Sequence, residues 1–324
     1  MKIKRTERHI IIKHHNHFDE IDALCLKSKN LYNYANYLIR QEFFSTKKYQ
    51  NYYKIEKILK THETYKALPA QCSQQTLKLL HKNWKSFFCS IKDWKKNSKK
   101  YKGKPKTPFY KEKNGRFIVK YTYQTISNKS LKNGIIKPCK TKIEIKTKQT
   151  NIKEVRFIPQ TNCYVVEIIY EKGIKIDENL KKENYLSIDL GINNFITCIN
   201  NQGLRPFIVN GRILKSINQF YNKDKAVLMS FIGNKGSSKR IEKLTFKRNN
   251  KINDFFHKTS RKVIDYCVEH NIKNIVIGYN KDWKQNINLG KSNNQNIVCI
   301  PFLKLIRQIQ YKAEEVGVNV ILTE

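Results

Sequence analysis

Acidic residues are scarce in this sequence. The 324-residue chain has 26 Asp and Glu against 64 Lys and Arg, which gives a formal net charge of +38. This excess is larger than solubility requires and indicates a polyanionic partner. Most of it is lysine, which suits point-charge contact with phosphates and does not by itself specify bases. An AT-rich genome also enriches Lys, Asn, Ile and Tyr, so part of the charge reflects mutational bias.

Long apolar runs are also missing. No apolar run approaches the roughly 18 residues that a membrane-spanning helix needs, and no secretory signal peptide is found. Both absences favour nucleic acid over a membrane surface as the polyanion. Hydrophobic residues still make up 40% of the chain and charged residues 28%. The sequence therefore predicts a folded protein with room for two domains.

Paired cysteines are the third absence. None of the eight cysteines lies in a CxxC pair, so they offer no zinc site. Scattered cysteines without a secretory signal predict reduced thiols in a cytoplasmic protein. The run His14-His15-Asn16-His17 is a candidate metal site, but we favour a solvated turn. The cysteines are Cys25, Cys72, Cys89, Cys139, Cys163, Cys198, Cys267 and Cys299.

The N-terminal part alternates between strand and helix patterns. Residues 2–13 and several short runs between 116 and 170 are strand-like, which suits a β-barrel. Apolar residues at three- and four-residue steps predict helices over 19–60 and 71–93. Tyrosines in the first helical stretch can stack on unpaired bases, although for any single one we favour the core. They are Tyr32, Tyr34, Tyr37, Tyr49, Tyr52 and Tyr53.

A lysine-rich segment follows the second helix. Residues 92–113 hold ten lysines and two acids, and Gly103, Pro105 and Pro108 prevent a helix. Such a loop is either simply solvated or lies along a phosphate backbone, and we expect the second. The predicted nucleic-acid contacts in it are Lys99, Lys100, Lys102, Lys104 and Lys106.

The C-terminal part begins with YLSIDLGINNF, residues 185–195. Leu186 and Ile188 alternate into Asp189, which predicts a buried strand that carries a carboxylate at its end. A second strand pattern, 195–200, and the turn 201–203 predict a hairpin. A carboxylate on a rigid strand suits Mg²⁺, whereas the alternative is a turn-forming acid.

The remaining pattern predicts an α/β domain that is consistent with an RNase H-like core. A helical stretch over 214–270 is broken at 233–238, and a strand at 275–277 precedes a polar loop, 279–296. A helix over 302–316 and a strand over 318–322 end the chain.

Together these motifs resemble the TnpB (OrfB) family of insertion-sequence transposons. Its members are RNA-guided DNA nucleases with a RuvC domain and are related to type V CRISPR effectors. The resemblance covers nearly the whole chain in the family's order. The segments that carry it, besides SIDLGINNF, are LPAQCSQQTLKLLHKNWKSFF (68–88), PFYKEK (108–113), GRILKSINQFYNK (211–223), NIVIGYNKDWKQ (274–285) and QNIVCIPFLKLIRQIQYKAEEV (295–316).

The resemblance implies a multi-domain α+β or α/β fold. Residues 1–18 and 115–182 would form a wedge-like β-barrel, 19–114 a helical insert with the lysine-rich linker, and 183–324 the RuvC (RNase H-like) domain. In RuvC sites three carboxylates bind two Mg²⁺ ions. Asp189 matches the first.

The second and third carboxylates depart from the family pattern. The strand position at which the family usually has its second, a Glu, is Gly278 here. Asp282 and Glu324 are substitutes, and we favour Glu324 because a strand end holds a ligand more rigidly than a loop. The third ligand and the zinc ribbon are expected beyond the end of this sequence. We therefore expect an incomplete active site in a truncated chain.

Two functions from different classes follow. The first is an RNA-guided, Mg²⁺-dependent DNA endonuclease with DNA and guide RNA as partners, in which Lys215, Asn218 and Lys223 contact nucleic acid. The second is a nucleic-acid-binding module of the same fold that does not cleave. An unrelated basic RNA-binding protein, as in ribosome assembly, is a third alternative.

Overall fold

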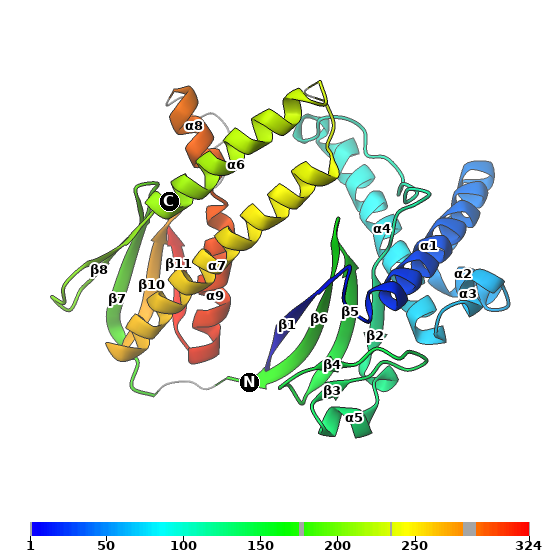
Figure 1. The fold of residues 1–324 in the computed structure, drawn as a ribbon, viewed down its shortest axis with the longest axis horizontal. Coiled ribbons are helices and arrows are strands. Elements are labelled where there is room, and N and C mark those ends of the chain that lie inside the picture. Colours follow the sequence, from blue (N-terminus) through cyan, green and yellow to red (C-terminus); the bar gives the residue numbers. More distant parts are fainter. Residues whose placement is uncertain (1, 175–177, 234, 281–289, 324) are drawn as a thin grey trace. The chain divides into compact units, whose positions relative to one another are not determined.

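The computed structural model describes residues 2–174, 178–233, 235–280 and 290–323 (Figure 1). The chain divides into two compact units, residues 4–172 and residues 173–324, and the first three residues are grouped with the second unit. Each unit has its own hydrophobic core. No described helix is long and apolar enough to cross a membrane.

The N-terminal unit contains a sheet in the order β1-β6-β5-β2, in which β5 pairs antiparallel with both of its neighbours. A separate antiparallel ladder joins β3 to β4. The predicted strand regions are confirmed, whereas closure into a barrel stays a prediction. The strands are β1 (Lys2–Ile12), β2 (Val119–Thr122), β3 (Ile135–Ile136), β4 (Ile145–Lys146), β5 (Ile152–Pro159) and β6 (Cys163–Gly173).

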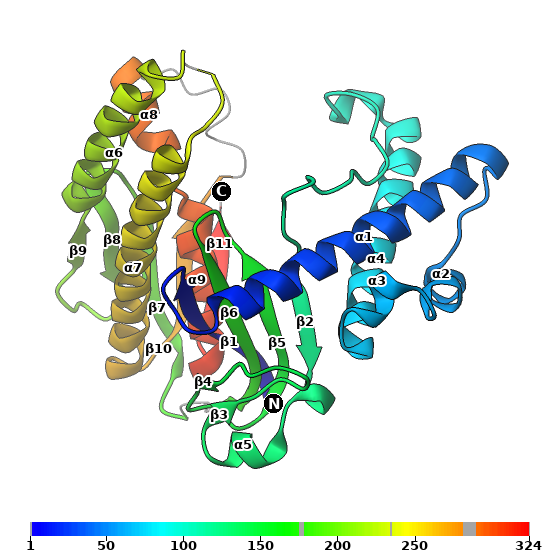
Figure 2. The ribbon, with the colours of Figure 1, turned by 45° about the vertical axis from the view of Figure 1, so that its right-hand side comes forward.

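Two long helices of this unit, α1 and α4, pack against each other (Figure 2). Trp84 of α4 is fully buried, and its indole N–H donates a hydrogen bond to Asn36 Oδ1 of α1 at 3.0 Å. The helical elements are α1 (Phe18–Thr46), α2 (Tyr52–Leu59), α3 (Glu63–Lys66), α4 (Ala70–Lys96), α5 (Asn128–Lys132) and the 3₁₀ turns η1 (Ser98–Lys100) and η2 (Tyr123–Thr125).

The C-terminal unit is built on a sheet in the order β11-β10-β7-β8-β9. β7, β8 and β9 form an antiparallel meander, and β10 and β11 run parallel to β7. The last strand therefore lies two places from the strand of Asp189. Gly203, at φ 72°, supplies the left-handed residue of the predicted β8–β9 turn. The strands are β7 (Lys181–Leu190), β8 (Asn194–Asn200), β9 (Phe207–Asn210), β10 (Ile272–Gly278) and β11 (Asn319–Thr323).

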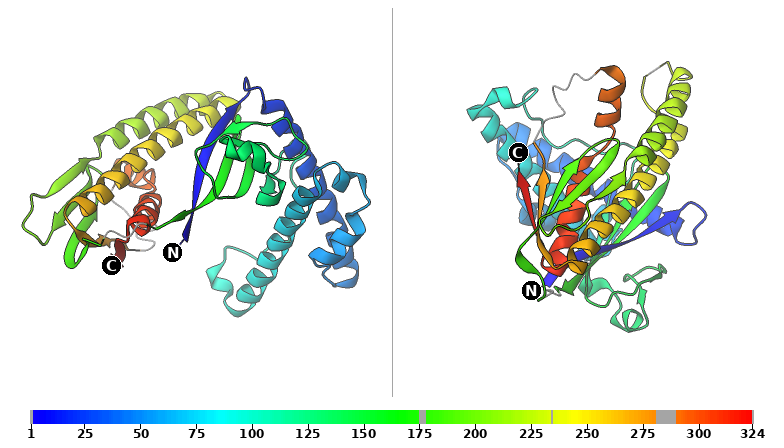
Figure 3. Two further views of the ribbon diagram at one scale, coloured as in Figure 1. Left: turned by 90° about the horizontal axis from the view of Figure 1, so that it is seen from below. Right: turned by 90° about the vertical axis from the view of Figure 1, so that its left-hand side faces the viewer.

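Helices α7 and α9 cover one face of this sheet. Leu186 and Ile188 of β7 share a buried core with Phe256 of α7 and Ile306 of α9. Helix α6 lies antiparallel beside α7 (Figure 3), and the predicted break at 233–238 separates the two. The sequence did not predict α8, which lies partly in the expected polar loop. The helices are α6 (Arg212–Ser230), α7 (Lys239–Glu269), α8 (Lys291–Val298) and α9 (Phe302–Val316).

Candidate metal ligand and nucleic-acid interface

Asp189 projects from the face of the sheet opposite the core helices. Along β7, Leu186 and Ile188 are buried and Tyr185, Ser187 and Asp189 are exposed. Since side chains alternate between the two faces of a strand, the buried pair faces α7 and α9 and Asp189 faces away. Its carboxylate is open to solvent and so is accessible to a hydrated cation.

Gly278 occupies the neighbouring position on β10. Ile188 pairs with Ile277, so Asp189 and Gly278 lie one residue further along two adjacent parallel strands, about 4.8 Å apart. Gly278 in turn pairs with Thr323 of β11. A Cβ added at Gly278 would meet no atom within 4 Å. The position expected for a second carboxylate is thus adjacent to Asp189 and sterically open, but glycine has no side chain with which to bind a metal.

Within the described ranges, the acids do not form a two-ion centre. No group of three or more His, Cys, Asp and Glu side chains is placed to hold a metal there. The proposed ligand Glu324 and its alternative Asp282 lie outside the described residues. One carboxylate suits a Mg²⁺ ion that keeps most of its water and binds substrate phosphate, but it does not fit a two-ion site.

The histidine cluster lies in an exposed turn between β1 and α1. The rings of His15 and His17 are 5.3 Å apart, and His17 Nε2 accepts a hydrogen bond from the backbone N–H of Glu144. The interpretation of this run as a turn is confirmed.

Two glycines allow close backbone approach here, Gly191 within the β7–β8 turn and Gly211 between that turn and the start of α6. The backbone N–H of Gly211 donates to the carbonyl of Asn193 at 2.7 Å, and a Cβ at 211 would overlap the carbonyl oxygen of Ile192. A Cβ at Gly191 would overlap the carbonyl oxygen of Asn194. Both positions therefore need glycine for close backbone approach. The sequence segments SIDLGINNF and GRILK meet at this junction.

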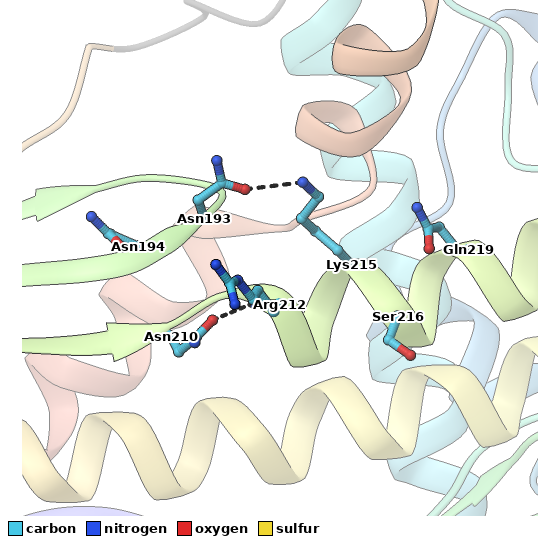
Figure 4. Close-up of a pocket in the computed structure, with 7 residues that line it drawn as sticks. All are labelled: Asn193, Asn194, Asn210, Arg212, Lys215, Ser216 and Gln219. Carbon is cyan, nitrogen blue, oxygen red and sulfur yellow. Dashed lines mark hydrogen bonds between the residues drawn. The ribbon is translucent and has the colours of Figure 1, made fainter.

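A polar cavity of about 500 Å³ lies at the junction (Figure 4). Its lining includes two cations and no acid. Lys215 Nζ donates to Asn193 Oδ1 at 2.9 Å, and the backbone N–H of Arg212 donates to Asn210 Oδ1 at 2.8 Å. A cavity of this kind favours a phosphate group. The lining residues are Asn193, Asn194, Asn210, Arg212, Lys215, Ser216 and Gln219.

The cavity and Asp189 lie at the same edge of the sheet. β9 is antiparallel to β8, which is antiparallel to β7, so β7 and β9 end at the same edge. Asp189 is near the end of β7, and Arg212 follows the end of β9. The parallel strand β10 also ends there, at Gly278. The fold thus brings the predicted metal ligand and the predicted contact Lys215 to one edge.

Asn218 requires a correction. It is 1% exposed, and its Oδ1 accepts hydrogen bonds from Arg248 Nε at 2.9 Å and Nη2 at 2.7 Å. Arg248 Nη2 also donates to the carbonyl of Cys299 at 2.6 Å. Asn218 therefore positions Arg248 and is not at the surface where a direct nucleic-acid contact would be made. One signal was present in the sequence: Asn218 lies one turn after Leu214, the other buried residue of α6.

The remaining predicted contacts are exposed lysines. Lys223 lies on α6, and the five lysines of the linker, 99 to 106, are all exposed. Lys100 forms an ion pair with Asp93 at 2.9 Å, and Lys104 lies 5.9 Å from the ring of Trp94. Their contact with nucleic acid stays a prediction.

Comparison with known proteins finds a match to a transposase family and a similar fold among solved structures. Residues 163–284, which include Asp189 and the whole cavity, match the OrfB_IS605 family, described as "Probable transposase". No curated protein matches the sequence. The fold is similar to that in "Cryo-EM structure of the Cas12f1-sgRNA-target DNA complex", with a TM-score of 0.55, 14% identity, and coverage of 93% of this chain and 72% of that chain. A second structure, "Cryo-EM structure of CRISPR-Cas12f Ternary Complex", has a TM-score of 0.36, 12% identity, and coverage of 93% and 70%.

Proposed function

We propose that this chain, which belongs to the OrfB (TnpB) transposase family by its residues 163–284, is an RNA-guided DNA endonuclease of the RuvC type. The observation that carries the proposal is the sheet edge that holds both Asp189 and the cationic cavity of Arg212 and Lys215. An antiparallel meander extended by two parallel strands is the arrangement expected of an RNase H-like nuclease.

Guide RNA and target DNA are the partners we propose. The net charge of +38 is suited to a polyanion, and the similar Cas12f1 structure is a complex with an sgRNA and target DNA. The basic residues that we assign to the phosphate backbone lie on α6 and in the linker. All eight cysteines are free thiols, as expected in a reducing compartment, and we place the activity in the cytoplasm.

Each described side chain has a separate role in this proposal. Arg212 and Lys215 neutralise and orient a backbone phosphate at the sheet edge, because their cavity has cationic and amide donors and no competing acid. Asp189 would hold a Mg²⁺ ion close to that edge. Bound Mg²⁺ supplies a polarised water and stabilises charge on phosphate oxygens. The described residues provide no ligands for a second ion, so we assign no step to one.

The alternative is a module of the same fold that binds nucleic acid without cutting it. Gly278 favours this alternative, because the strand position beside Asp189 provides no second carboxylate. The two functions use the same nucleic-acid-binding residues and differ only in whether a bound metal catalyses cleavage.

Mg²⁺-dependent cleavage of a DNA library by the chain, co-expressed with its flanking transposon RNA, separates them. Endonuclease function predicts cleavage that Asp189→Ala and Asp189→Asn abolish, while RNA affinity measured in EDTA stays unchanged. Cutting by Asp189→Ala would exclude Asp189 as the metal ligand. A wild type that binds RNA in a salt-sensitive way but does not cut would support the binding module.

A further inference from the structure

The segment 107–113 is fixed in an extended conformation along α1. Four α1 side chains, spaced by one helical turn, hold it mainly through its backbone. At the start of the segment, Arg40 Nη1 donates to Thr107 Oγ1 at 2.8 Å and to Pro108 O at 3.0 Å, and Asn36 Nδ2 also donates to Pro108 O, at 3.0 Å. In the middle, Asn33 pairs with the backbone of Lys111: its Nδ2 donates to Lys111 O at 2.8 Å and its Oδ1 accepts from Lys111 N at 2.7 Å. At the end, Lys29 Nζ donates to Lys113 O at 2.7 Å. The side chains of the segment are therefore presented from a rigid backbone.

Arg40 also joins aromatic rings from the two segments. Its guanidinium carbon lies 5.3 Å from the ring centroid of Phe44 and 5.2 Å from that of Tyr110. Distances of this size allow a cation–π interaction with both rings. Phe44 is nevertheless 50% exposed and Tyr110 45% exposed. The rings are thus held in place while much of their surface remains open to solvent.

Two further exposed rings extend this patch. Tyr37 precedes Arg40 by one turn on the same face of α1 and is 47% exposed, and Phe109, next to Tyr110, is 68% exposed. We call Tyr37, Phe44, Phe109 and Tyr110 the aromatic surface. Isolated exposed rings are ordinary, but four on adjoining segments indicate a binding site.

The other tyrosines of this region lie outside the aromatic surface. Tyr32 is 1% exposed and belongs to the core, and the ring of Tyr49 lies 5.7 Å from that of Trp84. Of the six tyrosines considered from the sequence, Tyr37 is the one in the aromatic surface. The two aromatic residues of the PFYKEK segment join it only because that segment folds back onto α1.

The charges around the aromatic surface are mainly positive. Lys47 and Lys48 follow the end of α1, and Lys104 and Lys106 precede the fixed segment, all of them exposed. The nearby acids are Glu112 and Glu42, whose carboxylate accepts a hydrogen bond from Thr46. Aromatic faces bordered by lysines are the combination that single-stranded nucleic acids require, since rings stack on bases and lysines neutralise phosphates.

We propose that the aromatic surface binds unpaired nucleobases of a single-stranded segment. A duplex does not fit this surface, because paired bases are already stacked on one another and their faces are inaccessible to the protein rings. The inference rests on the proposed nucleic-acid binding. Within that binding, α1 and residues 107–113 would distinguish single strands from duplexes.

The test measures binding without cleavage. The full chain in EDTA is titrated, by fluorescence anisotropy, into a labelled oligouridylate of about 12 nucleotides, within the usual site size, and into its duplex with oligoadenylate. Phe109→Ala and Tyr110→Ala are each expected to raise the Kd for the single strand by about 5- to 100-fold. The duplex Kd and the salt dependence are expected to stay the same. Tyr53→Ala is the matched control, since Tyr53 is 76% exposed on α2, outside the aromatic surface.

Two conservative variants separate stacking from folding. Tyr110→Phe keeps the ring and is expected to bind like the wild type, whereas Phe109→Leu keeps an apolar side chain without a π-face and is expected to bind like Phe109→Ala. If Phe109→Ala and Tyr110→Ala leave the single-strand Kd unchanged, or weaken duplex and single-strand binding equally, the proposal for the aromatic surface is wrong. The proposed function would not be affected by that result. A wild type that binds neither ligand would overturn the proposed function itself.

Discussion

The backbone N–H of Gly211 donates a hydrogen bond to the carbonyl of Asn193 at 2.7 Å. This bond fixes the first turn of α6 against the turn between β7 and β8. It places Arg212 and Lys215 beside Asn193 and Asn194, which follow the strand of Asp189. The spatial relation between Asp189 and the polar cavity therefore depends on a contact between two backbones, which cannot approach as closely if position 211 carries a side chain.

Gly211→Ala is expected to lower the free energy of unfolding by about 1–3 kcal/mol, the usual cost of forcing an extra carbon into a packed site. The physical reason is the overlap of the new Cβ with the carbonyl oxygen of Ile192. Urea unfolding of the two proteins measures the difference. Gly278→Ala is the control, because its Cβ meets nothing within 4 Å, and a change below about 0.5 kcal/mol is expected there. Equal losses at both positions would contradict the assigned role of Gly211.

Gly278→Glu is expected to strengthen Mg²⁺ binding. The new carboxylate would stand on the strand next to Asp189, about 4.8 Å away, and two adjacent carboxylates attract a divalent cation more strongly than one. We expect an increase in affinity of about tenfold or more, measured by calorimetric titration of MgCl₂.

The control for this substitution is Gly278→Gln, which has the same shape without the charge. An equal Mg²⁺ affinity in the Glu and Gln variants would show that position 278 does not share an ion with Asp189. Asp189→Asn combined with Gly278→Glu is expected to return the affinity to about that of the wild type, since one carboxylate then remains.

The sequence predicted local elements well wherever a single period covers the whole element. The last helix was expected over 302–316 and is found at Phe302–Val316. Its apolar residues repeat at helical spacing, and Gly317, at φ 84°, ends it in the left-handed conformation. The interruption between α6 and α7 was equally visible, because glycine and serine replace the periodic pattern there.

The candidate site was less predictable, because its features arise from tertiary contacts. The one-turn spacing from Leu214 indicated that Asn218 faces inward, but it did not show that Asn218 holds Arg248, because that bond joins two different helices. Periodicity did not show that the fixed segment 107–113 lies along α1, because the bonds join side chains to a distant backbone. The structural role of Gly211 was also not visible, because it follows only from the close approach of two backbone segments.

Lys215→Ala is expected to reduce the salt dependence of nucleic-acid binding. One fewer phosphate contact lowers the slope of log K against log salt concentration by about 0.9 for duplex DNA and about 0.7 for a single strand. The measurement is a series of Kd values between low and moderate salt. Lys215→Arg retains the charge and is expected to keep the slope. A slope that Lys215→Ala leaves unchanged would exclude a phosphate contact at the cavity.

Lys312 of α9 is expected to make the stability of the C-terminal unit depend on pH. Lys312 is 8% exposed, and its ammonium donates hydrogen bonds to the carbonyl of His257 at 2.6 Å and to Ser260 Oγ at 2.7 Å. Burial, assisted by the charge of Arg261, lowers the pKa of Lys312 from 10.5 to about 8. Between these two pH values the unfolded chain holds a proton that the folded chain has released, so stability rises with pH in that window.

Lys312→Met removes this titration and is expected to be more stable than the wild type at pH 7 by about 1–3 kcal/mol, since one pKa unit corresponds to about 1.4 kcal/mol. The advantage is expected to shrink as the pH rises from about 8 toward 10.5, because the wild-type side chain is then neutral in the folded state. Urea unfolding of both proteins at several pH values gives the difference, in which the titration of tyrosines and cysteines cancels. A difference that stays constant from pH 7 to pH 10 would show that Lys312 remains charged in the folded protein over that range.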